Sequence, residues 1–333
     1  MNTRRRKVVL TLAALAVAPQ LHAQSSQLLQ SSGQYRIAYL SGYSAEVDAP
    51  LLAAFMQGLS ELGYAEGRNI TIEVRRAGGR PDRVAALAAE LMAGKPHVFV
   101  VGGSAPAAQA VKAVAGATPI VMANVQDPVA SGLVTNLARP GGNITGMSDF
   151  HAASVTKRLE LMKEAIPGLK LVGVLWNQDS ATNARQLKDV QKAAPGLALK
   201  IVSLPVRKPD DLDGALASFG GQPGSGLLLL GDFVLSSNMK RIAQRAIEQR
   251  VPAVYTISSF IGAGGFMAYG TSFEDLWRRS AGFVDKILRG AKPGDLPIEQ
   301  PTKFDLIINL RTAKAIGVNV PRALLLRADQ VVE

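Results

Sequence analysis

Short apolar runs typical of buried β-strands alternate with amphipathic helical stretches along almost the whole chain. Residues 36–41 form one such run, and residues 48–64 follow with apolar side chains at helical spacing and Gly63 as a stop. Short connections between strand and helix indicate parallel strands, each joined to the next by a helix. The sequence therefore predicts an α/β protein, with helices on both faces of a parallel sheet. Further strand-like runs lie at residues 69–74, 97–101, 119–123, 171–176, 197–204, 226–230 and 252–256.

Two helix starts are predicted from their capping residues. Asp48 precedes the first helical stretch, which carries Pro50 in its first turn. Asp127 is followed by Pro128, and this pair predicts a helix over residues 127–137 with Asp127 as its N-cap.

Three glycine-rich or polar segments interrupt the alternation. They are residues 139–150 (RPGGNITGMSDF), 262–270 (GAGGFMAYG) and 300–310 (QPTKFDLIINL). We interpret them as crossings between two lobes, because a chain of 333 residues is long for one core and comfortable for two. The pattern predicts a hinged clamshell with several crossings. The expected lobes are residues 35–147 with 272–298 and residues 148–271 with 299–333.

The N-terminus has the pattern of a secretory signal peptide over residues 1–23. Four basic residues, Arg4 to Lys7, precede an apolar run over residues 8–18 and small residues around Ala23. The run is too short for a membrane span, so we expect cleavage near Ala23, a polar leader over residues 24–34 and a soluble periplasmic protein. The paired arginines leave both the general secretory and the twin-arginine routes open. The sequence has no cysteine, which removes a lipidated anchor, disulfides and thiol chemistry.

Motifs for the common enzyme and nucleic-acid chemistries are missing from the sequence. The Gly-x-Ser-x-Gly pattern fails at Ser104 and Ser148, and there is no phosphate loop, dinucleotide fingerprint or paired-histidine zinc motif. The net charge is +11, but the arginines lie among acids and their one dense cluster, residues 73–83, has no interleaved aromatic residue. The sequence therefore predicts no catalytic residue, no metal, no cofactor and no nucleic-acid partner.

The turn after the strand at residues 97–101 is a candidate ligand site. Gly103 lets a ligand approach the backbone, and the positive end of the following helix favours a carboxylate. Ser104 adds a hydroxyl that can bind the ligand, cap the helix or do both.

Other strand ends are expected to reach the same cleft, because two facing parallel sheets direct their carboxyl ends into it. Asp232 is the candidate partner for a ligand ammonium, since an acid just after a buried strand needs a polar partner. For Asp127 a helix cap is favoured over a ligand contact. The candidate set from both lobes is Ser41, Tyr43, Gly103, Ser104, Asn124, Asp127, Asn177, Asp232 and Phe233.

Long ordered blocks of the sequence resemble one known family, the exported substrate-binding proteins of ABC importers, in the group that includes tryptophan- and tyrosine-binding members. The blocks include LLAAFMQGLSELGYAEGRNITIEVRRAGGRPDRVAALAAEL, DPVASGLVTNLARPGGNITG, KRLELMKEAIPG and VDKILRGAKPGDLPIEQPTKFDLIINLRTAKAIGVNVPRALLLRADQVVE. The resemblance implies a two-lobed periplasmic-binding-protein fold of type I-like form, solute capture between the lobes, and no catalysis.

The same resemblance adds Tyr269 to the candidate site. A Tyr-Gly-Pro-Asn segment of the family appears here as residues 269–272, and Gln126 stands where relatives often carry glycine. Both positions are expected near the cleft or the hinge.

The leading functional hypothesis is capture of a small polar or aromatic solute, such as an amino acid, by a monomer that delivers it to ABC permease subunits in the inner membrane. Two alternatives stay open on the sequence. One is an exported ligand sensor for a membrane receptor, and the other is a secreted enzyme that uses the same cleft.

Overall fold

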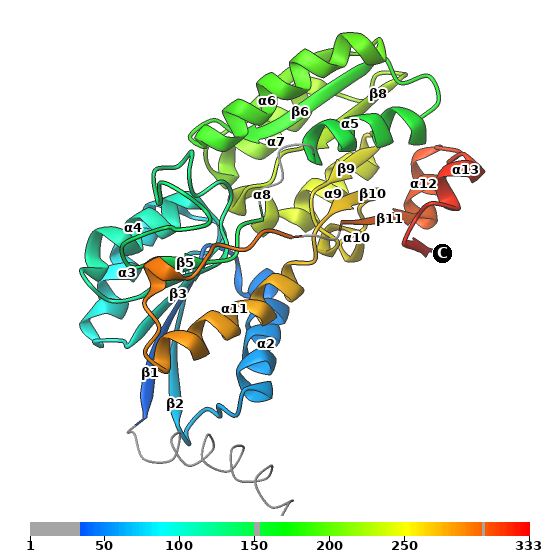
Figure 1. Ribbon diagram of the computed structural model, residues 1–333. Helices are drawn as coiled ribbons and strands as arrows, with labels where there is room; N and C mark the ends of the chain where they lie inside the picture. Colours follow the sequence, from blue (N-terminus) through cyan, green and yellow to red (C-terminus); the bar gives the residue numbers. More distant parts are fainter. Residues whose placement is uncertain (1–33, 150–153, 302–303) are drawn as a thin grey trace, which may run out of the picture.

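The computed structural model describes residues 34–149, 154–301 and 304–333, which form two α/β lobes (Figure 1). The expected signal peptide and all but the last residue of the expected leader lie outside these described residues. The α/β fold class with two lobes is confirmed. None of the described helices is both long enough and apolar enough to cross a membrane.

The first lobe is built on a five-stranded sheet with the order β2-β1-β3-β4-β5, in which all strands are parallel. Helices α2 and α11 cover one face, and α3 and α4 cover the other (Figure 1). The strands are β1 (Tyr35–Ser41), β2 (Ile70–Arg76), β3 (Val98–Gly102), β4 (Ile120–Asn124) and β5 (Ile144–Gly146), and the helices are α2 (Ala45–Glu61), α3 (Val84–Ala93), α4 (Ala105–Ala115) and α11 (Phe273–Leu288).

The second lobe is built on a seven-stranded sheet with the order β12-β11-β10-β9-β8-β6-β7. Helices α5, α6 and α12 pack on one face, and α7, α9 and α10 pack on the other. The strands are β6 (Leu171–Asn177), β7 (Lys200–Val206), β8 (Ser225–Leu229), β9 (Ala253–Tyr255), β10 (Met267–Gly270), β11 (Asp305–Asn309) and β12 (Gln330–Val332). The helices are α5 (Ser154–Ala165), α6 (Ala181–Ala193), α7 (Leu212–Phe219), α8 (Phe233–Ser237), α9 (Met239–Glu248), α10 (Ser259–Gly262), α12 (Leu310–Ile316) and α13 (Arg322–Leu325).

The second sheet is not wholly parallel, which corrects the expectation for this lobe. Strand β11 pairs with β10 in antiparallel orientation, and β12 follows the direction of β11. The physical reason is the path of the chain. Strand β10 ends where the chain leaves for α11 in the first lobe, and β11 begins where the chain returns, so the two strands run in opposite directions.

Two predicted helix starts are wrong. Helix α2 begins at Ala45, and Asp48 lies inside it with its carboxylate bonded to the Tyr39 hydroxyl (2.8 Å) and to Arg76 (2.6 Å). No α-helix forms over residues 127–137, because Gly132 at φ 71° ends a single turn. Asp127 still accepts a bond from the backbone of Ala130 (3.0 Å), so it caps this turn rather than a helix.

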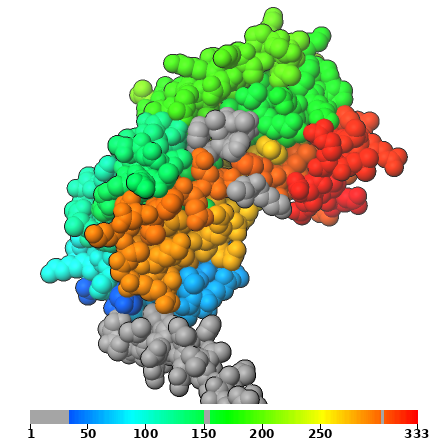
Figure 2. All heavy atoms as spheres, viewed as in Figure 1, coloured from blue at the N-terminus to red at the C-terminus, as the bar shows by residue number. Residues whose placement is uncertain are grey.

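The two lobes are packed against each other, and Figure 2 shows the chain near residue 300, coloured orange, running between them. One continuous apolar cluster extends from α2 and α11 of the first lobe to α7 and α9 of the second. Phe233 at the start of α8 is part of this cluster, and a Cβ at Gly42 would lie 3.2 Å from its ring. Side chains of the two lobes are therefore in direct contact next to the open part of the cleft.

Candidate functional site

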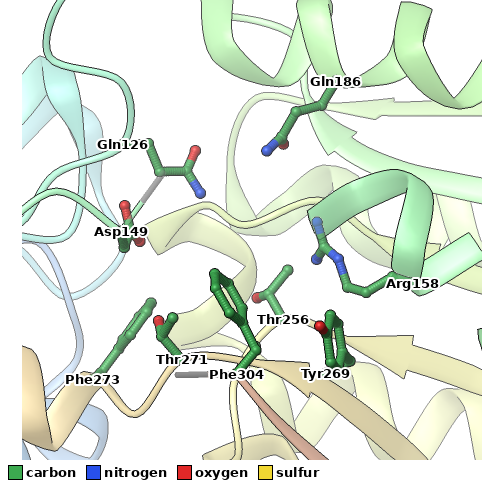
Figure 3. Close-up of a pocket in the computed structure, with 10 residues that line it drawn as sticks. Gln126, Asp149, Arg158, Gln186, Thr256, Tyr269, Thr271, Phe273 and Phe304 are labelled. Atoms are coloured by element: carbon green, nitrogen blue, oxygen red, sulfur yellow. The ribbon is translucent and has the colours of Figure 1, made fainter. Parts of the chain in front are cut away.

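A small cavity of about 30 Å³, which continues into space open to solvent, lies between the lobes beside the crossings (Figure 3). Its walls come from both lobes and from the segments that join them. Strand β10 contributes Tyr269, α5 contributes Arg158 and α6 contributes Gln186. The complete lining consists of Gln126, Asp149, Arg158, Gln186, Thr256, Tyr269, Gly270, Thr271, Phe273 and Phe304.

Arg158 brings a buried positive charge to the cavity. Its residue is 2% exposed, and one guanidinium nitrogen donates to the carbonyl of Leu229 (3.1 Å). Burial lowers the pKa of Arg158 to about 10, and the nearby charge of Asp149 partly offsets this effect. The group therefore stays protonated at neutral pH. An arginine guanidinium binds a carboxylate better than any other side chain does, because its donors lie in one plane and can form two parallel hydrogen bonds with the two oxygens.

Asp149 brings an acid to the same cavity, three residues after the end of β5. Its Oδ1 atom is buried and has no hydrogen-bond partner among the described residues. Burial raises the pKa of Asp149 to about 7, while a backbone hydrogen bond and the charge of Arg158 act in the opposite direction. A buried carboxylate oxygen without a donor is costly, so a cationic group that entered here would be strongly favoured.

Two glutamines face the cavity from opposite lobes (Figure 3). Gln126 follows β4, and its side chain reaches Gly231 of the other lobe. A Cβ atom at Gly231 would lie 2.4 Å from the Gln126 Nε2 atom, so the contact depends on glycine at this position. Gln186 is 5% exposed, and its Oε1 atom has no partner among the described residues.

Aromatic rings supply the apolar part of the wall. Tyr269 and Phe304 stack with their ring centroids 5.9 Å apart, and Phe304 points into the cavity (Figure 3). Phe273 contributes from the start of α11, where its ring lies 6.2 Å from that of Tyr43. The cavity thus combines a carboxyl group, a guanidinium group, two carboxamides and flat apolar surfaces. This combination can hold a molecule that carries a positive charge, a negative charge and an apolar side chain.

Of the ten candidate residues from the sequence, Tyr269 lines this cavity. Tyr43 and Asn124 lie instead in a buried network at the ends of β1, β3 and β4. The Asn124 amide donates to the Tyr43 hydroxyl (2.6 Å) and accepts from the Gly103 backbone (3.1 Å), and the Ser41 hydroxyl accepts from the Tyr43 backbone (3.2 Å). These bonds tie the strand ends to one another.

Ser104 and Asp232 both cap helices in this structure. The Ser104 hydroxyl accepts from the backbone of Ala107 in α4 (3.3 Å). Asp232 accepts from Val234 in α8 (2.7 Å) and from the Asn177 amide (3.1 Å), and burial raises the pKa of Asp232 to about 6. Their role in ligand binding stays a prediction.

The remaining candidates lie at contacts between the lobes. Asp127 forms an ion pair with Arg185 of α6. Gly103, at φ 107°, approaches the Gly42 backbone, and the Phe233 side chain lies against both glycines. Gly103 and Phe233 therefore help to join the lobes.

Most residues of the cavity are not among the candidates from the sequence, although the sequence contains one signal for them. Arg158 falls at helical spacing with Val155, Leu159 and Met162, all on the buried face of α5. A charged residue inside such an apolar stripe needs a partner, so it marks a candidate site. Gln186 has a similar position on α6, between the buried residues Asn183 and Leu187. Gln126, Gly270 and Thr271 line the cavity at positions expected near the cleft or the hinge, and the residues without any such expectation are Asp149, Thr256, Phe273 and Phe304.

Comparison with known proteins agrees with this architecture. Residues 48–332 match the family model of the ABC transporter substrate binding protein. A tyrosine-binding protein of Clostridioides difficile (strain R20291) is 28% identical over 281 residues, which cover 83% of this chain and 80% of the relative. That relative and the family are solute-binding proteins.

Two solved structures share the fold. A conserved domain protein of Vibrio cholerae is 27% identical, with a TM-score of 0.83. The match covers 90% of this chain and 99% of the Vibrio chain. The ABC domain of Streptococcus pneumoniae in complex with L-Trp is 23% identical with a TM-score of 0.83, covering 90% of this chain and 100% of its own. The expected family resemblance is confirmed: the chain belongs to the ABC transporter substrate-binding protein family.

Proposed function

We propose that this protein captures a zwitterionic, amino-acid-like solute between its lobes and delivers it to the permease of an ABC importer. The observation that carries the proposal is the presence of Arg158 and Asp149 in one cavity. Arg158 would bind the carboxylate of the solute, and Asp149 would bind its ammonium. Opposite charges placed in this way match an amino acid and disfavour molecules that carry only one of the two groups.

The aromatic wall supports a solute with an apolar side chain. Phe273, Phe304 and Tyr269 offer flat surfaces on which such a side chain can pack. The relative named for tyrosine and the neighbour solved with L-Trp agree with an aromatic amino acid as the first class to examine.

The position of the cavity between the lobes supports capture by closure. A solute that touches Gln126 of the first lobe and Arg158 of the second makes both contacts only when the lobes are together. Solute binding therefore favours the closed arrangement, which is the form that a permease could distinguish from the empty protein. Binding and release require no catalytic residue, so we propose a transport role without enzymatic activity.

A thermal-shift screen of the mature protein tests this function. We expect the standard amino acids to include at least one that raises the melting temperature, because a solute bound only by the folded state stabilises it. Tyrosine and tryptophan are the first probes, and tyramine and 3-(4-hydroxyphenyl)propionate are matched controls that lack the carboxylate or the amine. No shift with any amino acid would contradict the proposal, as would equal shifts with tyrosine and both controls.

Export is a further part of the proposed function, and it concerns residues outside the described part of the chain. We expect the precursor to be cleaved near Ala23 and the product to be a periplasmic monomer. Mass spectrometry of the fractionated cells measures both the N-terminus and the compartment. An intact N-terminus in the cytoplasmic fraction would contradict export.

A further inference from the structure

Gln186 has an unsatisfied acceptor at the wall of the cavity. The residue is 5% exposed, and its Oε1 atom is buried without a hydrogen-bond partner among the described residues. Figure 3 shows its side chain directed into the cavity from α6. Buried carbonyl oxygens are nearly always paired, and the exceptions in a folded protein need an explanation.

The position of Gln186 is firmly held. Asn183, one turn earlier in α6, donates to the carbonyl of Gly231 (3.0 Å) and accepts from the backbone of Asn177 (3.1 Å). These bonds join the beginning of α6 to the ends of β6 and β8. The first turns of α6, which carry Gln186, are therefore anchored to these strand ends.

Gln186 and Asp149 are separate acceptors. Asp149 enters the cavity from the segment after β5, whereas Gln186 enters from α6 in the second lobe. The proposed function assigns the solute ammonium to Asp149 and the solute carboxylate to Arg158. The acceptor of Gln186 is then left for another part of the solute.

We propose that Gln186 Oε1 accepts a hydrogen bond from the side chain of the solute, so that the site selects amino acids with a side-chain donor over their apolar counterparts. The donor is a hydroxyl, an amide or an indole N–H. This inference rests on the proposed function, because it takes the two charged residues to hold the backbone groups of an amino acid.

The expected selectivity follows from the cost of an unpaired acceptor. An apolar analogue displaces water from the cavity and leaves Oε1 without a donor. Sites built to pair with a substrate N–H or O–H reject analogues that lack it much more strongly than apolar pockets reject an added methylene. We expect a preference of about 10- to 100-fold within a matched pair.

Calorimetric titration of the mature protein with three matched pairs tests the inference. The pairs are tyrosine and phenylalanine, tryptophan and 1-methyltryptophan, and threonine and valine. In the pair that binds most tightly, we expect the donor-bearing member to be preferred by at least about 10-fold. Gln186→Met should reduce this preference to about twofold or less, since methionine is similar in size and offers no comparable acceptor.

Two further variants separate hydrogen bonding from packing. Gln186→Glu retains side-chain acceptors and should retain the preference, whatever happens to the absolute affinity. Gln191→Met, an exposed position on the same helix, should behave as the unaltered protein. Circular dichroism would verify that each variant is folded.

The outcomes distinguish this inference from the proposed function. If an amino acid binds but the members of its pair bind equally, the inference is wrong and the proposed function stands. Loss of the preference in Gln186→Glu would also overturn it, because the amide would then act as a donor. If no amino acid binds, the proposed function fails and this inference fails with it.

Discussion

Asp149→Asn is expected to weaken the binding of tyrosine by at least about 30-fold at pH 8, because the solute ammonium would enter a buried site without its counter-charge. The amide that replaces the carboxylate also has an N–H₂ group that faces the ammonium unfavourably. Isothermal titration calorimetry measures the change. The matched control is Asp210→Asn, which removes an acid at an exposed position far along the chain. Unchanged affinity in the Asp149 variant would remove this residue from the site.

The same variant should remove a pH dependence of binding. With a pKa of about 7, the Asp149 carboxyl of the empty protein is largely protonated below neutral pH. The solute ammonium requires the carboxylate, so a proton must leave before binding. Affinity should therefore rise by up to about tenfold per pH unit as the pH increases towards 7 and level off above it. The asparagine variant should show no such rise between pH 6 and pH 8.

Stability should change in the opposite direction to binding. The folded-state pKa of Asp149 is raised above its unfolded value, so the protonated acid stabilises the fold at low pH and this stability is lost as the pH rises through 7. Asparagine removes the buried charge altogether. We therefore expect the empty variant to melt no lower than the unaltered protein at pH 8. A folded, stable protein that binds poorly would exclude unfolding as the cause.

Arg158→Met is expected to weaken tyrosine binding by about 30- to 1,000-fold, because the solute carboxylate would be buried without its positive partner. The binding of tyramine, which has no carboxylate, should change much less. Arg158→Lys keeps the charge but not the planar fork, so its affinity should fall between the two. Equal losses for tyrosine and tyramine would contradict the assignment of the carboxylate to Arg158.

The arginine variant should also alter Asp149. The positive charge of Arg158 lowers the pKa of the Asp149 carboxyl, against the larger effect of burial. Its removal should raise that pKa further above 7. The residual binding of tyramine should then require a higher pH than in the unaltered protein. Titrations at pH 7 and pH 9 measure this shift.

The strands were predictable from the sequence because their signal is local. Strands β3, β4 and β8 are buried along their whole length, so they appear as unbroken apolar runs. Helices α5 and α6 carry buried side chains at helical spacing, and this spacing can be recognised within each segment without reference to the rest of the chain. The missing helix after Asp127 shows the limit, because Asp127 and Gly132 both have positive φ angles, which a capping pattern in the sequence does not reveal.

The cavity was harder to predict because it depends on how the lobes meet. Strand ends were expected to hold the solute, and this follows from the general position of ligands in parallel sheets. Here Phe233 lies against Gly42 and Gly103, and contacts between the lobes take up that space. The cavity instead collects Asp149, Arg158 and Gln186 from three elements. Asp149 and Arg158 are nine residues apart, but Gln186 lies on another helix 28 residues further along, so no local pattern joins all three.

The antiparallel pair of β10 and β11 places two cavity residues beside the points where the chain crosses between the lobes. Tyr269 lies on β10, and Phe304 immediately precedes β11. In a rotation of the lobes about these crossings, displacement would grow with distance from them, so these two rings would move little while Phe233 and Gly42 would separate further. The part of the aromatic wall formed by Tyr269 and Phe304 would then keep its shape in the open protein. An arriving solute would find a preformed surface, and its rate of entry would depend on the width of the mouth rather than on rearrangement of the wall.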